Sequence, residues 1–383
     1  MCALFAETRP SGEVFLSLAE SVTANGIAPI ESGTIAGVRF SLVSARGEAL
    51  KGSARVTLDS SAGLALDRAY LKARFLHDAG SAALRLTLGK APISWGKGFL
   101  FNAGDPIFGA LPRVTALSSD EYRTTTAWMA SAYVPLGTFS FVEAVGLPRV
   151  SSRSGDQNAG SDENATITVA RAVTGIENPN NRAGCRALIT PGWDVLQSVE
   201  TGFLASDTGI LSAYGAFDGS FVVDWYGALS ARWDKVGSNP QTPELALSFG
   251  LFRIFSIIPG RQLTARAEAL VYPAANRELW YPELWLGLTD DLSVFARGIV
   301  ATGRRVAHIA DEAMSGDAVI DATGALDALP WLDSGSALAS LGFSWVLLND
   351  ITLSGDALWR LGKGDDESIE PGLTVQAGFT CAF

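Results

Sequence analysis

The chain has 383 residues and a formal net charge of −11, and 48% of its residues are hydrophobic while only 18% are charged. An ordinary globular domain has about 25% charged residues, so a surface that faces only water is disfavoured. The negative balance argues against a nucleic-acid partner, because no basic excess is available to neutralise phosphates. The cysteines, Cys2, Cys185 and Cys381, lack the number of a disulfide framework and the spacing of a metal site. We therefore expect free thiols, no metal and no cofactor.

The apolar composition is not explained by membrane-spanning helices. Such a helix needs about 20 mainly apolar residues. The longest uncharged stretch, 124–142, is interrupted by Pro135 and Gly137 and reads as two strands and a turn. Only helices and closed barrels cross lipid, because every backbone group must be satisfied internally. The composition leaves two classes: a transmembrane β-barrel, or a very apolar soluble β-protein.

The first residues resemble the tail of a cleaved leader. Cleavage after Ala6 would fit, although Leu4 stands where a small residue is preferred, and a lipid anchor on Cys2 is an alternative. We assign residues 1–12 to a leader remnant or periplasmic tail and residues 13–383 to a single barrel domain. We expect no plug or periplasmic domain before the barrel.

Apolar and polar residues then alternate in segments of about ten residues, the pattern of an outer-membrane barrel. In the first clear segment, Val38, Phe40 and Leu42 alternate with polar neighbours, and the pattern returns at 53–59, 68–75, 84–89, 221–232, 263–269, 351–361 and 372–383. The expected fold is all-β: a single transmembrane antiparallel up-and-down β-barrel of about 18 strands (16–18), with short periplasmic turns and long external loops. A soluble sandwich also alternates, so this pattern alone leaves that alternative open.

The connections between these segments have two lengths. Tight turns are expected near 47–48, 78–80, 135–137, 218–219, 290–291 and 349–350, and long polar connections at 23–35, 92–122, 147–163, 234–243, 303–335 and 362–371. If 183–205 is one irregular strand around Pro191 and Gly192, all tight turns fall at one end of the barrel and all long connections at the other. This parity favours a barrel over a sandwich.

Cations gather on the polar phase of the early segments, with Asp59 the main opposing acid. They are Arg39, Arg55, Arg68, Lys72, Arg74 and Arg85. On neighbouring strands they would form a basic stripe on the inner wall, which would raise the local concentration of anions. In the alternative interpretation they pair across the lumen with Asp224, Glu268, Glu283 and Asp356 in a structural network.

A glycine-rich segment follows the 84–89 strand. Residues 89–106 run from a glycine and a basic residue to Trp-Gly, then to asparagine and aspartate, and this segment resembles the strand-end segment of several porin-like families. The connection is long enough to fold into a lumen and narrow it. The candidates for such a constriction are Trp95, Lys97, Asn102 and Asp105. An external loop held by packing of Trp95 is the alternative.

The last segment also carries a resemblance. Its alternation ends on an aromatic residue, and Gln376, Gly378, Cys381 and Phe383 resemble the assembly signal of outer-membrane barrel proteins. The resemblance implies recognition by the barrel-assembly machinery. An edge strand left exposed would invite aggregation, whereas in a barrel the last strand pairs with the first.

Signals for catalysis are weak. The only histidines are His77, expected at the periplasmic end, and His308, so we expect no enzyme. The acidic run 365–367 lacks the ordered spacing of a calcium loop. The porin-like resemblance implies a channel in the outer membrane of a Gram-negative-type (diderm) bacterium, spirochaetes included. It would let small hydrophilic solutes diffuse passively, with a leaning toward anions. The alternatives are a surface structural or adhesive barrel with a plugged lumen, and a transporter of hydrophobic small molecules.

Overall fold

The computed structural model describes residues 7–23, 31–46, 49–60, 63–75, 84–111, 125–137, 139–150, 180–234, 242–258, 261–303, 336–348, 350–361 and 372–383. These residues form 18 strands: β1 (Glu7–Thr23), β2 (Glu31–Arg46), β3 (Leu50–Asp59), β4 (Gly63–Phe75), β5 (Leu84–Pro92), β6 (Thr126–Pro135), β7 (Phe141–Leu147), β8 (Arg182–Ile189), β9 (Leu196–Ser206), β10 (Leu211–Ser220), β11 (Asp224–Trp233), β12 (Glu244–Ile258), β13 (Arg261–Tyr272), β14 (Arg277–Gly287), β15 (Leu292–Gly303), β16 (Ala337–Leu348), β17 (Ile351–Leu361) and β18 (Gly372–Ala382). Within the described ranges, no helix is long and apolar enough to cross a membrane.

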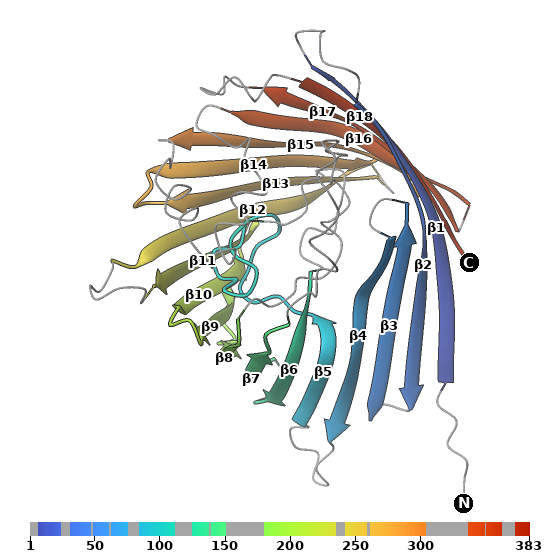
Figure 1. Ribbon diagram of the computed structural model, residues 1–383. Helices are drawn as coiled ribbons and strands as arrows, with labels where there is room; N and C mark the ends of the chain where they lie inside the picture. Colours follow the sequence, from blue (N-terminus) through green and yellow to red (C-terminus); the bar gives the residue numbers. More distant parts are fainter. Residues whose placement is uncertain are drawn as a thin grey trace, which may run out of the picture.

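The strands close into a single barrel (Figure 1). Each strand pairs antiparallel with its neighbours in the chain, and β1 pairs with both β2 and β18. At the seam, Val14 lies opposite Val38 on one side and opposite Cys381 on the other. The prediction of a closed antiparallel up-and-down barrel of 18 strands is confirmed, and the sandwich alternative is wrong, because the described strands form one sheet that closes on itself.

Alternation places the apolar side chains on the outside. Phe40 and Leu42 of β2 are 56% and 47% exposed, and Leu284 of β14 is 53% exposed. The residues of the opposite phase face inward, where Leu279 and Tyr281 of β14 are fully buried. A sheet with an apolar outer face and a largely polar inner face suits a barrel whose outside meets lipid.

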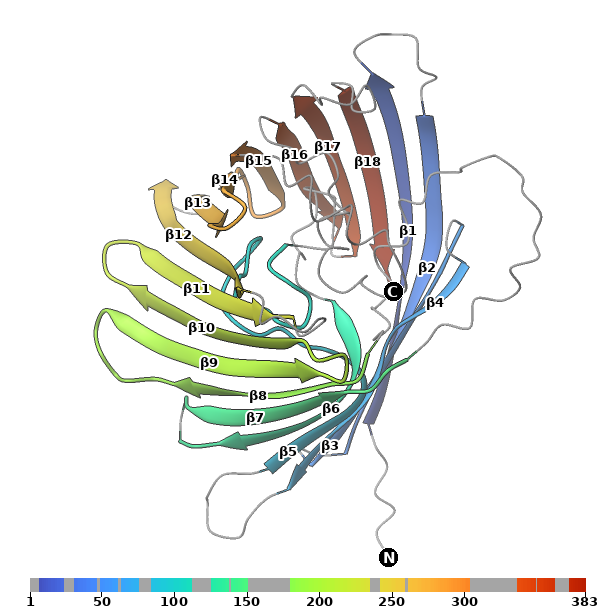
Figure 2. The same cartoon turned by 60° about the vertical axis from the view of Figure 1, so that its left-hand side comes forward.

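The connections obey the expected parity. Gly12 and Phe383 exchange two backbone hydrogen bonds of 2.8 Å, so both described ends of the chain lie beside the turn between β2 and β3. We call this the tight-turn end (Figure 2). The strands that end here are β2, β4, β6, β8, β10, β12, β14 and β16. The connections that we expected to be long leave the opposite end, together with short turns such as Ser206–Ile210.

Two details of the predicted connections are wrong. Residues 183–205 are not one irregular strand: they contain nearly all of β8, a turn in which Gly192 has φ of +71°, and nearly all of β9. A positive φ suits a glycine, and the chain reverses there. The turn expected at 218–219 lies inside β10, and the chain turns instead at Phe221–Val223.

The barrel wall begins earlier than the boundary expected at residue 13. β1 starts at Glu7, and Gly12 already pairs with Phe40 of β2. Residues 7–12 therefore belong to the first strand. The leader interpretation of residues 1–6 concerns residues outside the described part and stays a prediction.

Candidate functional site

The segment that follows β5 lies inside the barrel (Figures 1 and 2). Residues 93–111, which we call the inner loop, bury most of their apolar side chains: Trp95, Leu100, Phe101, Ile107 and Leu111 are at most 2% exposed. They pack in one cluster with lumen-facing residues of the wall, including Tyr214, Ala228, Leu270, Tyr281 and Leu338. The hydrophobic core therefore lies between the inner loop and the inner face of the wall that β6–β16 form.

The predicted Trp-Gly segment shapes this loop. Gly96 has φ of +73°, and a Cβ there would lie 2.6 Å from Asn102 Oδ1 and from the Gly104 carbonyl oxygen, so only glycine fits. Asn102 Nδ2 donates to the Trp95 carbonyl at 2.7 Å, and Asn102 Oδ1 accepts from Gly104 N–H at 3.1 Å. Asp105 Oδ1 accepts from the amides of Ile107 and Phe108 at 3.0 and 3.2 Å. Short polar side chains thus form hydrogen bonds with backbone groups of the loop that would be paired with a neighbouring strand in a sheet.

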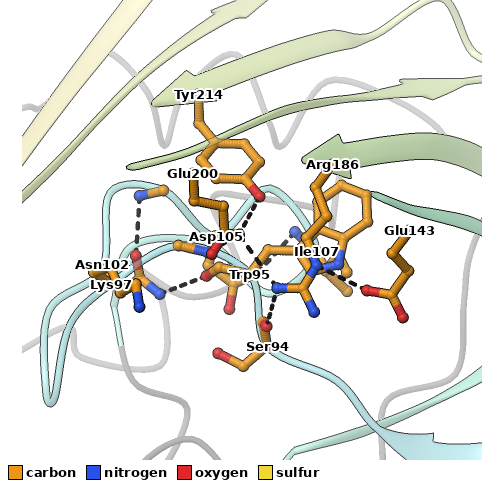
Figure 3. Close-up of polar contacts among 12 residues, drawn as sticks. Ser94, Trp95, Lys97, Asn102, Asp105, Ile107, Glu143, Arg186, Glu200 and Tyr214 are labelled. Atoms are coloured by element: carbon orange, nitrogen blue, oxygen red, sulfur yellow. Dashed lines mark hydrogen bonds and ion pairs between the residues drawn. The ribbon is translucent and has the colours of Figure 1, made fainter. Parts of the chain in front are cut away.

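A buried glutamate of β9 holds the start of the loop (Figure 3). Glu200 is 2% exposed, and its Oε1 accepts from Gly96 N–H at 3.0 Å, from the Tyr214 hydroxyl at 2.5 Å and from Arg186 Nη1 at 3.2 Å. Arg186 of β8 also donates to the Ser94 carbonyl at 3.0 Å and to Glu143 Oε2 at 2.7 Å. A buried carboxylate is tolerated only when it is paired and hydrogen-bonded, and both conditions are met here.

A second buried glutamate holds the middle of the loop. Glu268 of β13 is 3% exposed and accepts three consecutive backbone amides, those of Phe99 at 2.7 Å, Leu100 at 2.7 Å and Phe101 at 2.9 Å. The hydroxyl of Tyr226 also donates to it. Convergence of three N–H groups on one carboxylate fixes the backbone of a segment far away in the chain, because charge-assisted hydrogen bonds are stronger than neutral ones.

Further contacts tie the loop to the same side of the barrel. Ala103 N–H donates to Ser248 Oγ at 2.9 Å, and Arg182 Nη1 donates to the Ile107 carbonyl at 3.0 Å. The Lys97 ammonium lies 3.1 Å from Asp218 of β10. Each described anchor comes from the wall β8–β13, so the loop covers one side of the lumen.

The cations of the basic stripe line another side. They lie on the inward phase of β2–β5, because residues of the opposite phase on the same strands, Phe40, Leu58, Leu71 and Leu88, are exposed on the outer face. Arg55 lies opposite Arg68, Lys51 opposite Lys72, and Arg74 opposite Arg85. Lys51, Lys72 and Arg85 are exposed. We call this surface, on which like charges lie directly opposite one another, the basic wall.

Arg39 of the stripe is paired with an acid. Its Nη1 donates to both carboxylate oxygens of Glu13 at 3.1 Å, and its Nε donates to Thr57 Oγ1 at 3.4 Å. The side chain of Asp59, the acid that we expected to oppose the stripe, lies outside the described part. Arg55 Nε donates to Ser41 Oγ at 3.1 Å, and the ammonium of Lys72 lies 5.1 Å from the ring centroid of Tyr70.

The alternative in which the stripe pairs across the lumen is wrong for two of its acids. Glu268 binds loop amides, as described above. Glu283 accepts from Arg266 Nη1 at 2.7 Å, from Arg297 Nε at 2.9 Å and from the Tyr281 hydroxyl at 2.6 Å. Glu268 is therefore engaged by the inner loop and Glu283 by cations of β13 and β15, and none of these contacts involves a cation of the stripe.

The four constriction candidates fall into two groups. Trp95, Asn102 and Asp105 are at most 3% exposed and hold the fold of the inner loop. Lys97 is 29% exposed at its side chain and is the one of the four that contacts open space. The external-loop alternative is wrong, because residues 93–111 pack against the inner face of the barrel.

The anchors Glu200, Glu268, Arg182 and Arg186 were not identified as anchors from the sequence. Their position on the polar phase of a strand was readable, since Glu268 stands between Ala267 and Ala269 in an alternating run. Nothing in that run indicates that Glu268 binds the amides of residues 99–101, which lie 167–169 residues away in the chain.

No family model matches the chain, and no curated protein matches its sequence. Solved structures do match: OpdQ of Pseudomonas aeruginosa with a TM-score of 0.56, and OccK5 (OpdH) of the same organism with a TM-score of 0.58, each at 9% identity and over 98% of both chains. OccAB4 of Acinetobacter baumannii has a TM-score of 0.57 at 9% identity, again over 98% of both chains. The chain has the fold of an outer-membrane porin. At these identities the likeness concerns the fold alone.

Proposed function

We propose that this porin-fold protein is an outer-membrane channel through which small hydrophilic solutes diffuse passively, with a preference for anions. The observation that carries the proposal is the unequal lining of the lumen. The inner loop packs against the wall that β6–β16 form, while Lys51, Lys72 and Arg85 on the basic wall are exposed. Charged side chains that line a water-filled passage bias which ions enter it.

The membrane orientation follows from the lengths of the connections. In bacterial barrels, short turns face the periplasm and long loops face outward. We therefore assign the tight-turn end to the periplasm and place outer-membrane lipid against the exposed apolar band. The inner loop starts at the end of β5 that faces outward, so solutes would meet it on their way in. The proposal assigns no catalytic role to any residue.

Single-channel recording tests the proposal. Purified protein whose unheated sample migrates differently from the boiled one on a gel, as a folded barrel does, would be added to a planar bilayer in potassium chloride. Stepwise conductance increases are expected. A bilayer that stays closed in the presence of folded protein would favour the plugged surface barrel, and uptake of apolar solutes without ion conductance would favour the transporter of hydrophobic molecules.

We further propose that Gln376, Gly378 and Phe383 form the signal read by the barrel-assembly machinery. Gln376 Nε2 donates to Ser17 Oγ at 3.0 Å across the seam between β18 and β1. The Phe383 ring lies over Gly12, where an added Cβ would come within 2.3 Å of it. Phe383 is 68% exposed on the outer face of the barrel, where another protein can contact it.

Deletion of Phe383 is expected to lower the amount of folded barrel in the outer membrane several-fold. The channels that do assemble should keep the wild-type conductance, because the ring lies on the outer face and not in the lumen. Heat-modifiable protein in membrane fractions and single-channel recordings would measure the two effects. Phe383→Tyr, which keeps an aromatic ring, is the control, and equal yields for the deletion and the control would contradict the assignment.

A further inference from the structure

A cavity lies in the lumen on the tight-turn side of the inner loop. It has a volume of about 430 Å³ and is lined by residues of the loop and of β10–β12, among them Lys97, Phe99, Asp218, Asp224, Tyr226 and Phe252. Pockets that bind small molecules have volumes of about 300–1,000 Å³. The cavity is therefore large enough for a small organic molecule, whereas the cavity beside residues 103–111 has only about 110 Å³.

Strand pairing brings carboxylates and aromatic rings together in this cavity. Asp224 of β11 lies directly opposite Phe252 of β12, and Tyr226 lies opposite Asp218 of β10. These four residues face inward, because Leu229 and Leu251, on the opposite phase of β11 and β12, are exposed on the outer face. The cavity thus presents negative charge beside apolar ring surfaces.

The carboxylate of Asp224 is the group that lacks a partner. Within the part of the chain that the structure describes, it accepts no hydrogen bond and pairs with no cation, although Asp224 is half-buried. The cations nearest to the cavity are engaged elsewhere: the Lys97 ammonium lies 3.1 Å from Asp218, and Arg266 lies 2.7 Å from Glu283. A charge that is partly removed from water is stabilised by an opposite charge, so Asp224 favours a cationic ligand.

The aromatic rings of this region already contact a cation. The Cζ atom of Arg266 lies 3.4 Å from the ring centroid of Phe99 and 5.7 Å from that of Phe252. A cation within about 6 Å of a ring centroid is attracted by the electrons of the ring face. The ring surfaces that line the cavity can contact a second cation in the same way, since the charge of Arg266 is matched by Glu283.

From these contacts we propose that the cavity binds a small organic cation, namely a primary ammonium group on an apolar stem. The ammonium group donates to Asp224, and the stem packs against Phe99 and Phe252. An anion is disfavoured here, because it would lie beside Asp224 while Lys97 is paired with Asp218. The preference for anions proposed above concerns the basic wall on β2–β5, and this site does not depend on it or on conduction.

Calorimetric titration of the folded protein in an uncharged detergent tests the site, with phenethylammonium as the probe. Phenethyl alcohol has the same stem without the charge and is the matched control ligand. Asp224→Asn removes the charge of the carboxylate at nearly equal size, and Phe252→Leu removes the ring. Asp350→Asn, in the turn after β16, is the matched control substitution. Unheated gel mobility confirms that each variant is folded.

Phenethylammonium is expected to bind the wild type and Asp350→Asn alike, at a single site. Asp224→Asn should weaken binding about tenfold, because a hydrogen bond to a charged group is stronger than one to a neutral amide. Phe252→Leu should weaken it several-fold through loss of the ring face.

Equal affinity for phenethyl alcohol and phenethylammonium would overturn the proposal, because the cavity would then hold only the apolar stem. Unchanged binding to Asp224→Asn would overturn it as well, and so would a folded wild-type protein that binds no amine. The titration involves no ion flow. A closed bilayer would therefore contradict the channel and leave this site standing, and failure of the titration would leave the channel standing.

Discussion

Replacing Arg68, Lys72 and Arg74 together by glutamate is expected to turn the channel from anion preference to cation preference. The three residues lie on the inward phase of β4, and Arg68, Lys72 and Arg74 face Arg55, Lys51 and Arg85 of the neighbouring strands. The substitution changes the charge of the basic wall by six units. A shift of about 1.4 kcal/mol in the free energy of an ion is a factor of ten, so the ratio of anion to cation permeability should change by about tenfold or more.

The reversal potential in a potassium chloride gradient measures this change. The difference in reversal potential between the glutamate variant and the wild type should shrink as the salt concentration rises, because the Debye length falls from about 10 Å at 0.1 M to about 3 Å at 1 M. The matched control conserves charge: Arg68→Lys, Lys72→Arg and Arg74→Lys should leave the reversal potential near the wild-type value. An unchanged reversal potential in the glutamate variant would show that ions do not pass along the basic wall.

The fold could be predicted from the sequence because the determining features are local. Period-two alternation fixes which side of each strand faces outward, and a slip of one residue would exchange the two faces of a strand such as β2, with Phe40 and Leu42 outside. The loop parity then orders the strands into a closed barrel. The error at 183–205 arose because the reversal at Pro191 and Gly192 was set aside to preserve the parity of the connections, and the further turn at Ser206–Ile210, which restores that parity, was not predicted.

The candidate site was predictable only in part. The basic stripe was readable since alternation places Arg68, Lys72 and Arg74 on one phase. The position of the inner loop could not be predicted, because it depends on hydrogen bonds from the amides of residues 99–101 to Glu268, which lies on a strand distant in the sequence. Pairing across the lumen is a property of the closed barrel, and no spacing in the sequence encodes it.

Glu268→Ala is expected to release the inner loop and to replace one stable conductance level by several. The carboxylate accepts from Phe99, Leu100 and Phe101 N–H, and its removal leaves buried amides without that acceptor. Hydrogen bonds to charged groups contribute about 1.5–3 kcal/mol each, so three of them amount to at least about 4 kcal/mol. A change of that size alters the balance between two loop positions about a thousandfold.

Tyr226→Phe is the matched control for this prediction, because it removes the hydroxyl that donates to Glu268 and leaves the three loop amides with their acceptor. Its recordings should keep one conductance level. Glu268→Gln should lie between the two, since its amide oxygen can still accept, but without the charge that strengthens each bond. If Glu268→Ala opened and closed like the wild type, the other contacts of the loop, those of Glu200, Ser248 and Arg182, would suffice to hold it. The three glutamate-bound amides would then contribute to folding of the barrel and not to the position of the loop during conduction.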